Sequence, residues 1–113
     1  MSERTDRSGL PPAEVARIAD LVGYQPGAVV SREVVRKPAG TVTVFAFDDG
    51  QGLTEHTTPY DALAQVLEGE VEITISGSPY RVHAGESILM PGGQPHALHA
   101  VQRFKMILTM IRS

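Results

Sequence analysis

Apolar and polar residues alternate along most of the chain with the two-residue period of β-strands. The alternation is clearest at residues 71–75, where valine and isoleucine are separated by glutamate and threonine. This is the pattern of a strand with one face on a core and the other in water. From residue 28 onward such segments recur roughly every eight to twelve residues, separated by glycine or proline, which is typical of sandwiches and barrels. The pattern therefore predicts an all-β fold.

The alternating segments also give the positions of the expected strands. We expect strands at residues 29–36, 41–47, 54–57, 62–67, 71–76, 80–82, 87–90, 96–101 and 104–111. The segment 104–111 has apolar residues on both of its faces, so it should be buried on two sides. One side would face the core, and the other needs either an amino-terminal helix or a second subunit. We favour the second subunit and hence a homodimer.

A different period occurs before the first expected strand. Within Ala13 to Val22, apolar residues fall at i, i+3, i+4 and i+7, which predicts a short helix after Pro11 and Pro12 that ends at Gly23. Residues 1–9 are polar and should form a flexible amino-terminal tail. Residues 10–113 should form a single domain.

Composition narrows the class of protein. A chain of 113 residues with 42% hydrophobic content has enough apolar residues for one core. The formal net charge is −3 and the basic residues are scattered, so we expect no nucleic-acid partner. The absence of cysteine excludes disulfides, thiolate ligands and a cysteine nucleophile. Without a run of membrane-spanning length or a signal-like segment, we expect a cytoplasmic protein with no membrane partner.

One segment combines turn residues with a histidine at fixed spacing. Gly85, Pro91, Gly93 and His96 follow the pattern G-x5-P-x-G-x2-H. The two glycines suit turn positions with positive φ, and the proline ends the short apolar strand at 87–90. The backbone should therefore orient His96.

A related segment lies upstream, with Gly52 and His56 followed by a Val-Leu-Glu-Gly-Glu sequence that ends at Glu70. Together the two segments resemble the paired motifs of the cupin superfamily, G-x5-H-x-H-x3,4-E-x6-G and G-x5-P-x-G-x2-H-x3-N. The resemblance covers about half the chain, from Gly52 to Ala100, and in the second motif only the final asparagine is replaced, by Ala100. It implies a small single-domain, RmlC-like cupin, whose fold is a double-stranded β-helix or jelly-roll barrel.

The resemblance also implies a site. Cupins usually hold one divalent metal with two histidines and a glutamate from the first motif and one histidine from the second. Here His56 takes the first of these positions and His96 the last, while Thr58 and Ala62 occupy the other two. If a metal such as iron, manganese, nickel or zinc is bound, His56 and His96 are therefore its expected ligands.

The alternative is a metal-free histidine pair in a polar cavity. In that case His56 and His96 would hydrogen-bond each other, a water or an organic ligand, and either could act as an acid or base. Candidates to line the pocket are Thr58, Tyr60 and Gln65. His99 should point away from His96 because of strand alternation, and His83 should be an exposed turn residue.

Three kinds of function remain open for a small-molecule-binding cupin of this sequence. The first is a metal-dependent enzyme of the dioxygenase or isomerase type. The second is metal-free acid–base catalysis, as in epimerase-type cupins, with His56 or His96 as the base and Tyr60 as a possible donor. The third is a non-catalytic module that binds a metabolite.

Overall fold

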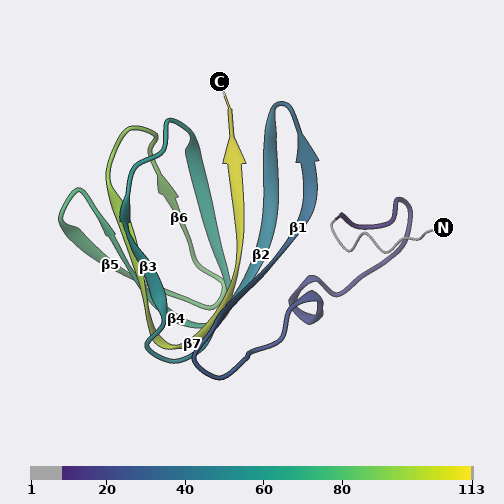
Figure 1. The fold of residues 1–113 in the computed structure, drawn as a ribbon, viewed down its shortest axis with the longest axis horizontal. Helices are drawn as coiled ribbons and strands as arrows, with labels where there is room; N and C mark the ends of the chain where they lie inside the picture. Colours follow the sequence, from purple (N-terminus) through teal and green to yellow (C-terminus); the bar gives the residue numbers. More distant parts are fainter. Residues whose placement is uncertain (1–8, 113) are drawn as a thin grey trace.

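The protein is all-β, as the sequence predicts, in a computed structural model that describes residues 9–112 (Figure 1). The tail predicted at residues 1–9 lies outside the described residues except for Gly9, whose N–H donates to the Glu33 carbonyl. The strands are β1 (Val29–Lys37), β2 (Gly40–Phe47), β3 (Gly52–His56), β4 (Asp61–Ile75), β5 (Ser78–His83), β6 (Ser87–Met90) and β7 (His96–Ile111).

The two longest strands, β4 and β7, pair antiparallel along almost their whole length and carry the other strands on either side. In one half of the barrel, β2 pairs with residues 104–111 of β7, and β1 pairs with the other edge of β2. In the same half, β6 pairs with residues 62–65 of β4. In the other half, β3 pairs with β7 near His96 and β5 pairs with residues 70–75 of β4. The halves converge at the lower end of the view and separate toward the top (Figure 1).

Both long strands bend where the halves meet. The register between β4 and β7 shifts between Val66 and Val71, and Gly69 has a φ of 81°. A Cβ at Gly69 would collide with the Arg103 carbonyl oxygen and with Phe104. The sequence predicted a strand break at each bend, and this was wrong, because a glycine bulge lets a strand turn while pairing continues on both sides.

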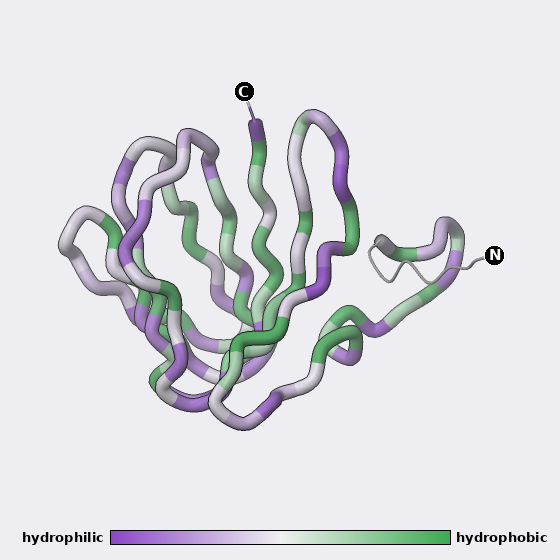
Figure 2. The backbone as a smooth tube through the Cα atoms, viewed as in Figure 1, coloured by the Kyte–Doolittle hydropathy of each residue, from purple (hydrophilic) through white to green (hydrophobic). Residues whose placement is uncertain are grey.

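The main core fills the space between the halves. Phe47, Val71, Ile73, Phe104 and Met106 are fully buried, and the rings of Phe47 and Phe104 stack with centroids 4.6 Å apart. Figure 2 shows hydrophobic stretches along the central strands that supply this core. Met90 and Met106 are both buried in this core, where the flexible methionine side chain fills space between the other residues.

A second apolar cluster lies on the outer face of β1 and β2. Val34, Val44 and Ala46 are buried there together with Val22 of the amino-terminal segment. Lys105 of β7 is also buried, and its Nζ donates to the Ala19 carbonyl at 2.7 Å. The amino-terminal segment therefore covers part of the second buried face that the sequence predicted. The homodimer stays a prediction.

The helix predicted at residues 13–22 is reduced to a single 3-10 turn, η2 (Ile18–Leu21). Residues 11–17 are all exposed, and Val15, on the predicted apolar stripe, is fully so. A helix this short is not stable without tertiary packing, and only the end of the segment reaches the barrel. No helix within residues 9–112 is long and apolar enough to span a membrane.

Candidate functional site

The fold brings His56 and His96 together. His56 is the last residue of β3 and His96 the first of β7, and the two are partners in the register of that strand pair. Their ring centroids lie 4.4 Å apart with the ring planes at 66°. Residues separated by about 40 positions in the sequence therefore form one imidazole pair.

The orientation of His96 follows from strand alternation and the turn before it. His96 shares the inward face of β7 with Leu98 and Ala100 and is only 6% exposed, whereas His99 is exposed on the opposite face, as predicted. Gly85 and Gly93 have φ values of 87° and 83°, which confirms the positive φ that the sequence predicted for both turns. His56 is exposed, because β3 is a short edge strand.

Backbone carbonyls fix the proton positions on both rings. The Nδ1 of His56 lies 2.8 Å from the Thr54 carbonyl oxygen, and the Nδ1 of His96 lies 3.3 Å from the Gln94 carbonyl oxygen. A carbonyl only accepts hydrogen bonds, so each Nδ1 must be the donor and carry the proton. In the neutral form of each histidine the lone pair is then on Nε2.

The protein also disfavours the charged form of His96. Burial lowers the pKa of His96, the positive charge of a protonated His56 lowers it further, and the hydrogen bond to Gln94 opposes both. His96 is therefore mainly neutral at pH 7. Its Nε2 is available as an acceptor or base.

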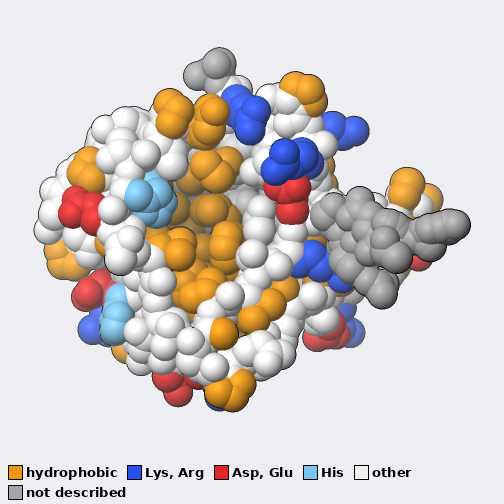
Figure 3. All heavy atoms as spheres, viewed as in Figure 1, with side chains coloured by type: hydrophobic (Ala, Val, Ile, Leu, Met, Phe, Trp, Pro, Cys, Tyr) orange, Lys and Arg blue, Asp and Glu red, His pale blue; other side chains and the backbone are white. Residues whose placement is uncertain are grey.

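The pair lies at the open end of the barrel, which we call the mouth. Half-buried apolar side chains pack against the core on the inner surface, including Phe45, Leu53, Leu108 and Met110. Figure 3 shows a hollow lined by hydrophobic side chains with a histidine at its edge. A ligand here would meet apolar walls and a small number of polar nitrogen atoms, which is typical of small-molecule sites.

The other predicted pocket residues lie in three different settings. The Thr58 hydroxyl donates to the Tyr60 carbonyl at 3.3 Å, and Thr58 is half-buried. Tyr60 is half-buried, with the Arg112 guanidinium 5.2 Å from its ring centroid. Gln65 is exposed between the buried residues Ala64 and Val66, so strand alternation puts it on the outer face. The structure thus does not bring Gln65 to the histidine pair.

The loops beside the pair are tied to each other. The Gly92 N–H donates to Asp61 Oδ1 at 2.8 Å, and the Gly93 N–H donates to the Thr58 carbonyl at 2.7 Å. Ser76 donates from its hydroxyl to Gln94 Oε1 at 3.1 Å, which holds the residue whose carbonyl orients His96. Thr54 and Gln94 could not be predicted from the sequence, because they act through their backbone carbonyls, which leave no signal in residue type.

His83 is exposed, as predicted, although it ends a strand rather than lying in a turn. Its Nδ1 lies 3.1 Å from Glu86 Oε1 and its Nε2 lies 3.4 Å from Glu70 Oε2. Arg81 also contacts Glu70, at 2.7 Å. These groups form a polar cluster that joins β4, β5 and the turn before β6.

The residues at the mouth do not fit a tightly held catalytic divalent metal. Mononuclear catalytic zinc sites usually have three protein ligands, whereas here the two remaining motif positions hold Thr58 and the buried methyl group of Ala62. Within residues 9–112 no three or more histidine, cysteine, aspartate or glutamate side chains gather as a metal site. Two neutral imidazoles without a carboxylate bind divalent ions weakly.

The fold and the paired histidines define a small β-barrel protein of the cupin type. The cupin domain family model matches residues 43–112, and the chain belongs to this family. A conserved protein of unknown function from Streptococcus pyogenes is 35% identical, with a TM-score of 0.88 over 99% of this chain and 98% of that one. No curated protein matches the chain.

Two further solved structures are similar to this chain. A cupin 2 conserved barrel domain protein from Leptotrichia buccalis is 39% identical, with a TM-score of 0.81 over 83% of this chain and 46% of that one. A cupin superfamily protein from Desulfitobacterium hafniense is 22% identical and shows the same fold, with a TM-score of 0.86 over 98% of this chain and all of that one.

Proposed function

We propose that this cupin binds a small organic molecule at the mouth of its barrel, with the Nε2 atoms of His56 and His96 as its main polar contacts. The observation that carries the proposal is the pair of hydrogen bonds from Nδ1 to the Thr54 and Gln94 carbonyls. These bonds use the single N–H group of each neutral ring. The two Nε2 atoms therefore remain as neighbouring acceptors beside an apolar hollow.

This arrangement favours a ligand with hydrogen-bond donors and an apolar body. A hydroxyl group of the ligand would donate to an Nε2 atom, and its carbon skeleton would contact the apolar lining. A ligand with an acidic C–H or O–H group could instead lose that proton to Nε2, and the lowered pKa of His96 supports His96 as the neutral base. The proposal therefore includes metal-free acid–base chemistry of the isomerase or epimerase type.

A divalent metal held by His56 and His96 is the second candidate. It is favoured by the same hydrogen bonds, because metal-ligating histidines commonly donate their other ring N–H to a carbonyl. When bound, such an ion would supply Lewis-acid chemistry. With two protein ligands, we expect it to be removed by dialysis against a chelator.

A single experiment separates the two candidates. Untagged protein is analysed for metals by mass spectrometry before and after dialysis against chelator, and the dialysed protein is then titrated with a panel of small hydroxy and keto acids and sugars. Binding is followed by NMR of the histidine rings. The variants are His56→Ala and His96→Ala, with His99→Ala on the outer face as the matched control.

The proposal predicts a compound that shifts the ring signals of His56 and His96 in metal-free protein. That response should be lost in His96→Ala and kept in His99→Ala. A metal present at one per chain before dialysis, removed by the chelator and absent from both site variants, would instead support the second candidate. A metal-free protein whose histidine signals respond to none of the compounds would contradict the proposal.

A further inference from the structure

A second pocket lies on the side of the barrel, between the free edges of β5 and β6. Within the described residues, β5 pairs only with β4 in one half, and β6 pairs only with β4 in the other. The two edges diverge and leave an opening of about 440 Å³, lined by Tyr80, Arg81, Val82, Glu86, Ser87 and Ile88. This volume is in the range of small-molecule sites.

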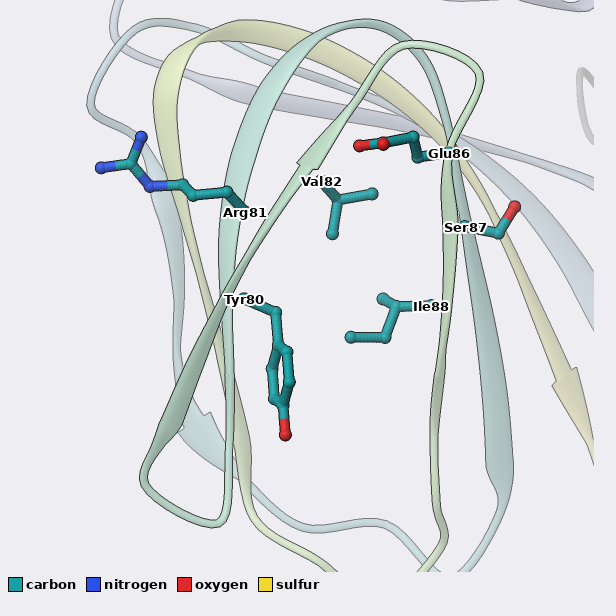
Figure 4. A pocket seen from close by; sticks show the side chains of 6 residues that line it. All are labelled: Tyr80, Arg81, Val82, Glu86, Ser87 and Ile88. Carbon is teal, nitrogen blue, oxygen red and sulfur yellow. The ribbon is translucent and has the colours of Figure 1, made fainter.

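The inner surface of this side pocket is apolar and partly aromatic. Figure 4 shows Tyr80 and Val82 from β5 and Ile88 from β6 pointing into the space between the strands. Val82 is buried and Ile88 half-buried, whereas Tyr80 is 46% exposed. An aromatic ring with that much exposed surface beside two aliphatic side chains offers a flat contact for an apolar group.

The charge available in the side pocket is negative. Arg81 points away from it in Figure 4, and its guanidinium is already paired with Glu70 at 2.7 Å and Glu72 at 3.5 Å. Glu86 turns toward the opening in the same view, and its Oε1 accepts from the backbone N–H and the Nδ1 of His83. These recorded bonds all use Oε1, so Oε2 is the carboxylate oxygen left for a ligand.

Glu86 remains ionised across the neutral range. The backbone hydrogen bond from His83 and the contact with the His83 ring lower the pKa of the Glu86 carboxyl below its usual value. In Figure 4 Glu86 lies at one end of the pocket and Tyr80 at the other, with Val82 and Ile88 between them. An amine can therefore place its ammonium group on the carboxylate while its apolar body extends along the aliphatic side chains toward the ring.

We propose that the side pocket between β5 and β6 binds a small organic amine, with its ammonium group on Glu86 and its apolar body on Tyr80, Val82 and Ile88. The site is separate from the histidine pair in its residues and in its chemistry. The histidine pair offers Nε2 acceptors, whereas the side pocket offers a carboxylate. An anionic ligand would suit neither Glu86 nor the paired Arg81.

The test is an NMR titration of the full chain with 2-phenylethylamine, using neutral 2-phenylethanol of nearly the same shape as the matched probe. We expect the amine to shift the backbone amide signals of Tyr80, Val82 and Ile88 and to bind about 2- to 5-fold more tightly than the alcohol. Glu86→Gln keeps the acceptor for His83 and should remove that preference. Tyr80→Ala should weaken both probes.

Two control variants keep the test specific. Glu55→Gln removes an exposed carboxylate on β3 that does not line the side pocket, and His96→Ala alters the mouth. Both should bind the amine as the unaltered protein does. Equal binding of amine and alcohol, an amine preference that persists in Glu86→Gln, or no shift at the pocket residues up to the solubility limit would each overturn the proposal.

Discussion

The two ends of the barrel differ in whether their polar side chains are already paired within the protein. At the bent end, around Gly69 and Arg103, the Tyr24 hydroxyl donates to Glu68 at 2.6 Å, and the Arg103 guanidinium lies 4.8 Å from the centre of the Tyr24 ring. At the mouth, His56 and His96 each use one nitrogen and keep the other as a free acceptor.

This difference separates polar groups that stabilise the fold from those available to a ligand. A polar group that is already paired in the folded chain gains little from a new partner. An acceptor that has no recorded partner beside an apolar hollow gains a hydrogen bond when a ligand arrives. Substitutions at the bent end should therefore change stability, and substitutions at the mouth should mainly change binding.

The largest expected loss of stability comes from substituting the glycines at the two ends of the barrel. Gly69 and Gly93 both have positive φ, but a Cβ at Gly69 would collide with backbone atoms of Arg103 and Phe104, whereas Gly93 has nothing within 4 Å. Gly69→Val should lower the free energy of unfolding by about 3 kcal/mol or more, or prevent folding. Gly93→Val should cost about 1 to 2 kcal/mol.

Urea unfolding followed by circular dichroism measures both variants. Equal losses of stability would mean that the bend at Gly69 relaxes easily. The account of β4 and β7 as strands that depend on a glycine to pass between the halves would then be wrong.

Removal of the Tyr24 hydroxyl should cause a smaller loss of stability. Glu68 accepts its hydrogen bond, and burial together with the Glu68 carboxylate raises the pKa of Tyr24 well above its usual range. Tyr24→Phe should lower the free energy of unfolding by about 1 kcal/mol and leave the histidine NMR signals at the mouth unchanged. Tyr80→Phe, on the exposed edge of β5, is the matched control. Unchanged stability in Tyr24→Phe would remove the contrast between the ends.

His96 at the mouth should make the free energy of unfolding depend on pH. Burial lowers the pKa of His96 in the folded state, so below the unfolded pKa of about 6.5 the unfolded chain binds more protons than the folded chain. The resulting contribution to stability is complete above that pH and is lost as the pH falls through the folded pKa.

The contribution of His96 is tested by measuring the free energy of unfolding between neutral and mildly acidic pH. The loss on acidification should be smaller in His96→Gln than in the unaltered protein, and the difference between the two curves isolates His96. Parallel curves would show that His96 titrates alike in the folded and unfolded chain.

Local patterns predicted much of the fold and part of the site. The strand alternation correctly placed His96 inward and His99 outward, and the glycine spacing correctly gave positive φ at Gly85 and Gly93. The helical period at residues 13–22 failed, because periodicity shows which face a helix would bury but not whether a surface exists to receive Val15.

Features that depend on pairing between distant segments could not be predicted. The continuity of β4 through Gly69 depends on hydrogen bonds to β7, and the contact of His56 with His96 depends on the register of β3. The side pocket combines Tyr80 and Ile88 from strands that are not paired with each other. None of these contacts can be predicted from the residue types of a single segment.

The tautomer of each histidine can be measured by long-range proton–nitrogen NMR on labelled protein at a pH where the rings are neutral. We expect His56 and His96 both to be protonated at Nδ1 and to carry the lone pair at Nε2. A proton on Nε2 of His96 would contradict this expectation, because the mouth would then lack its buried acceptor.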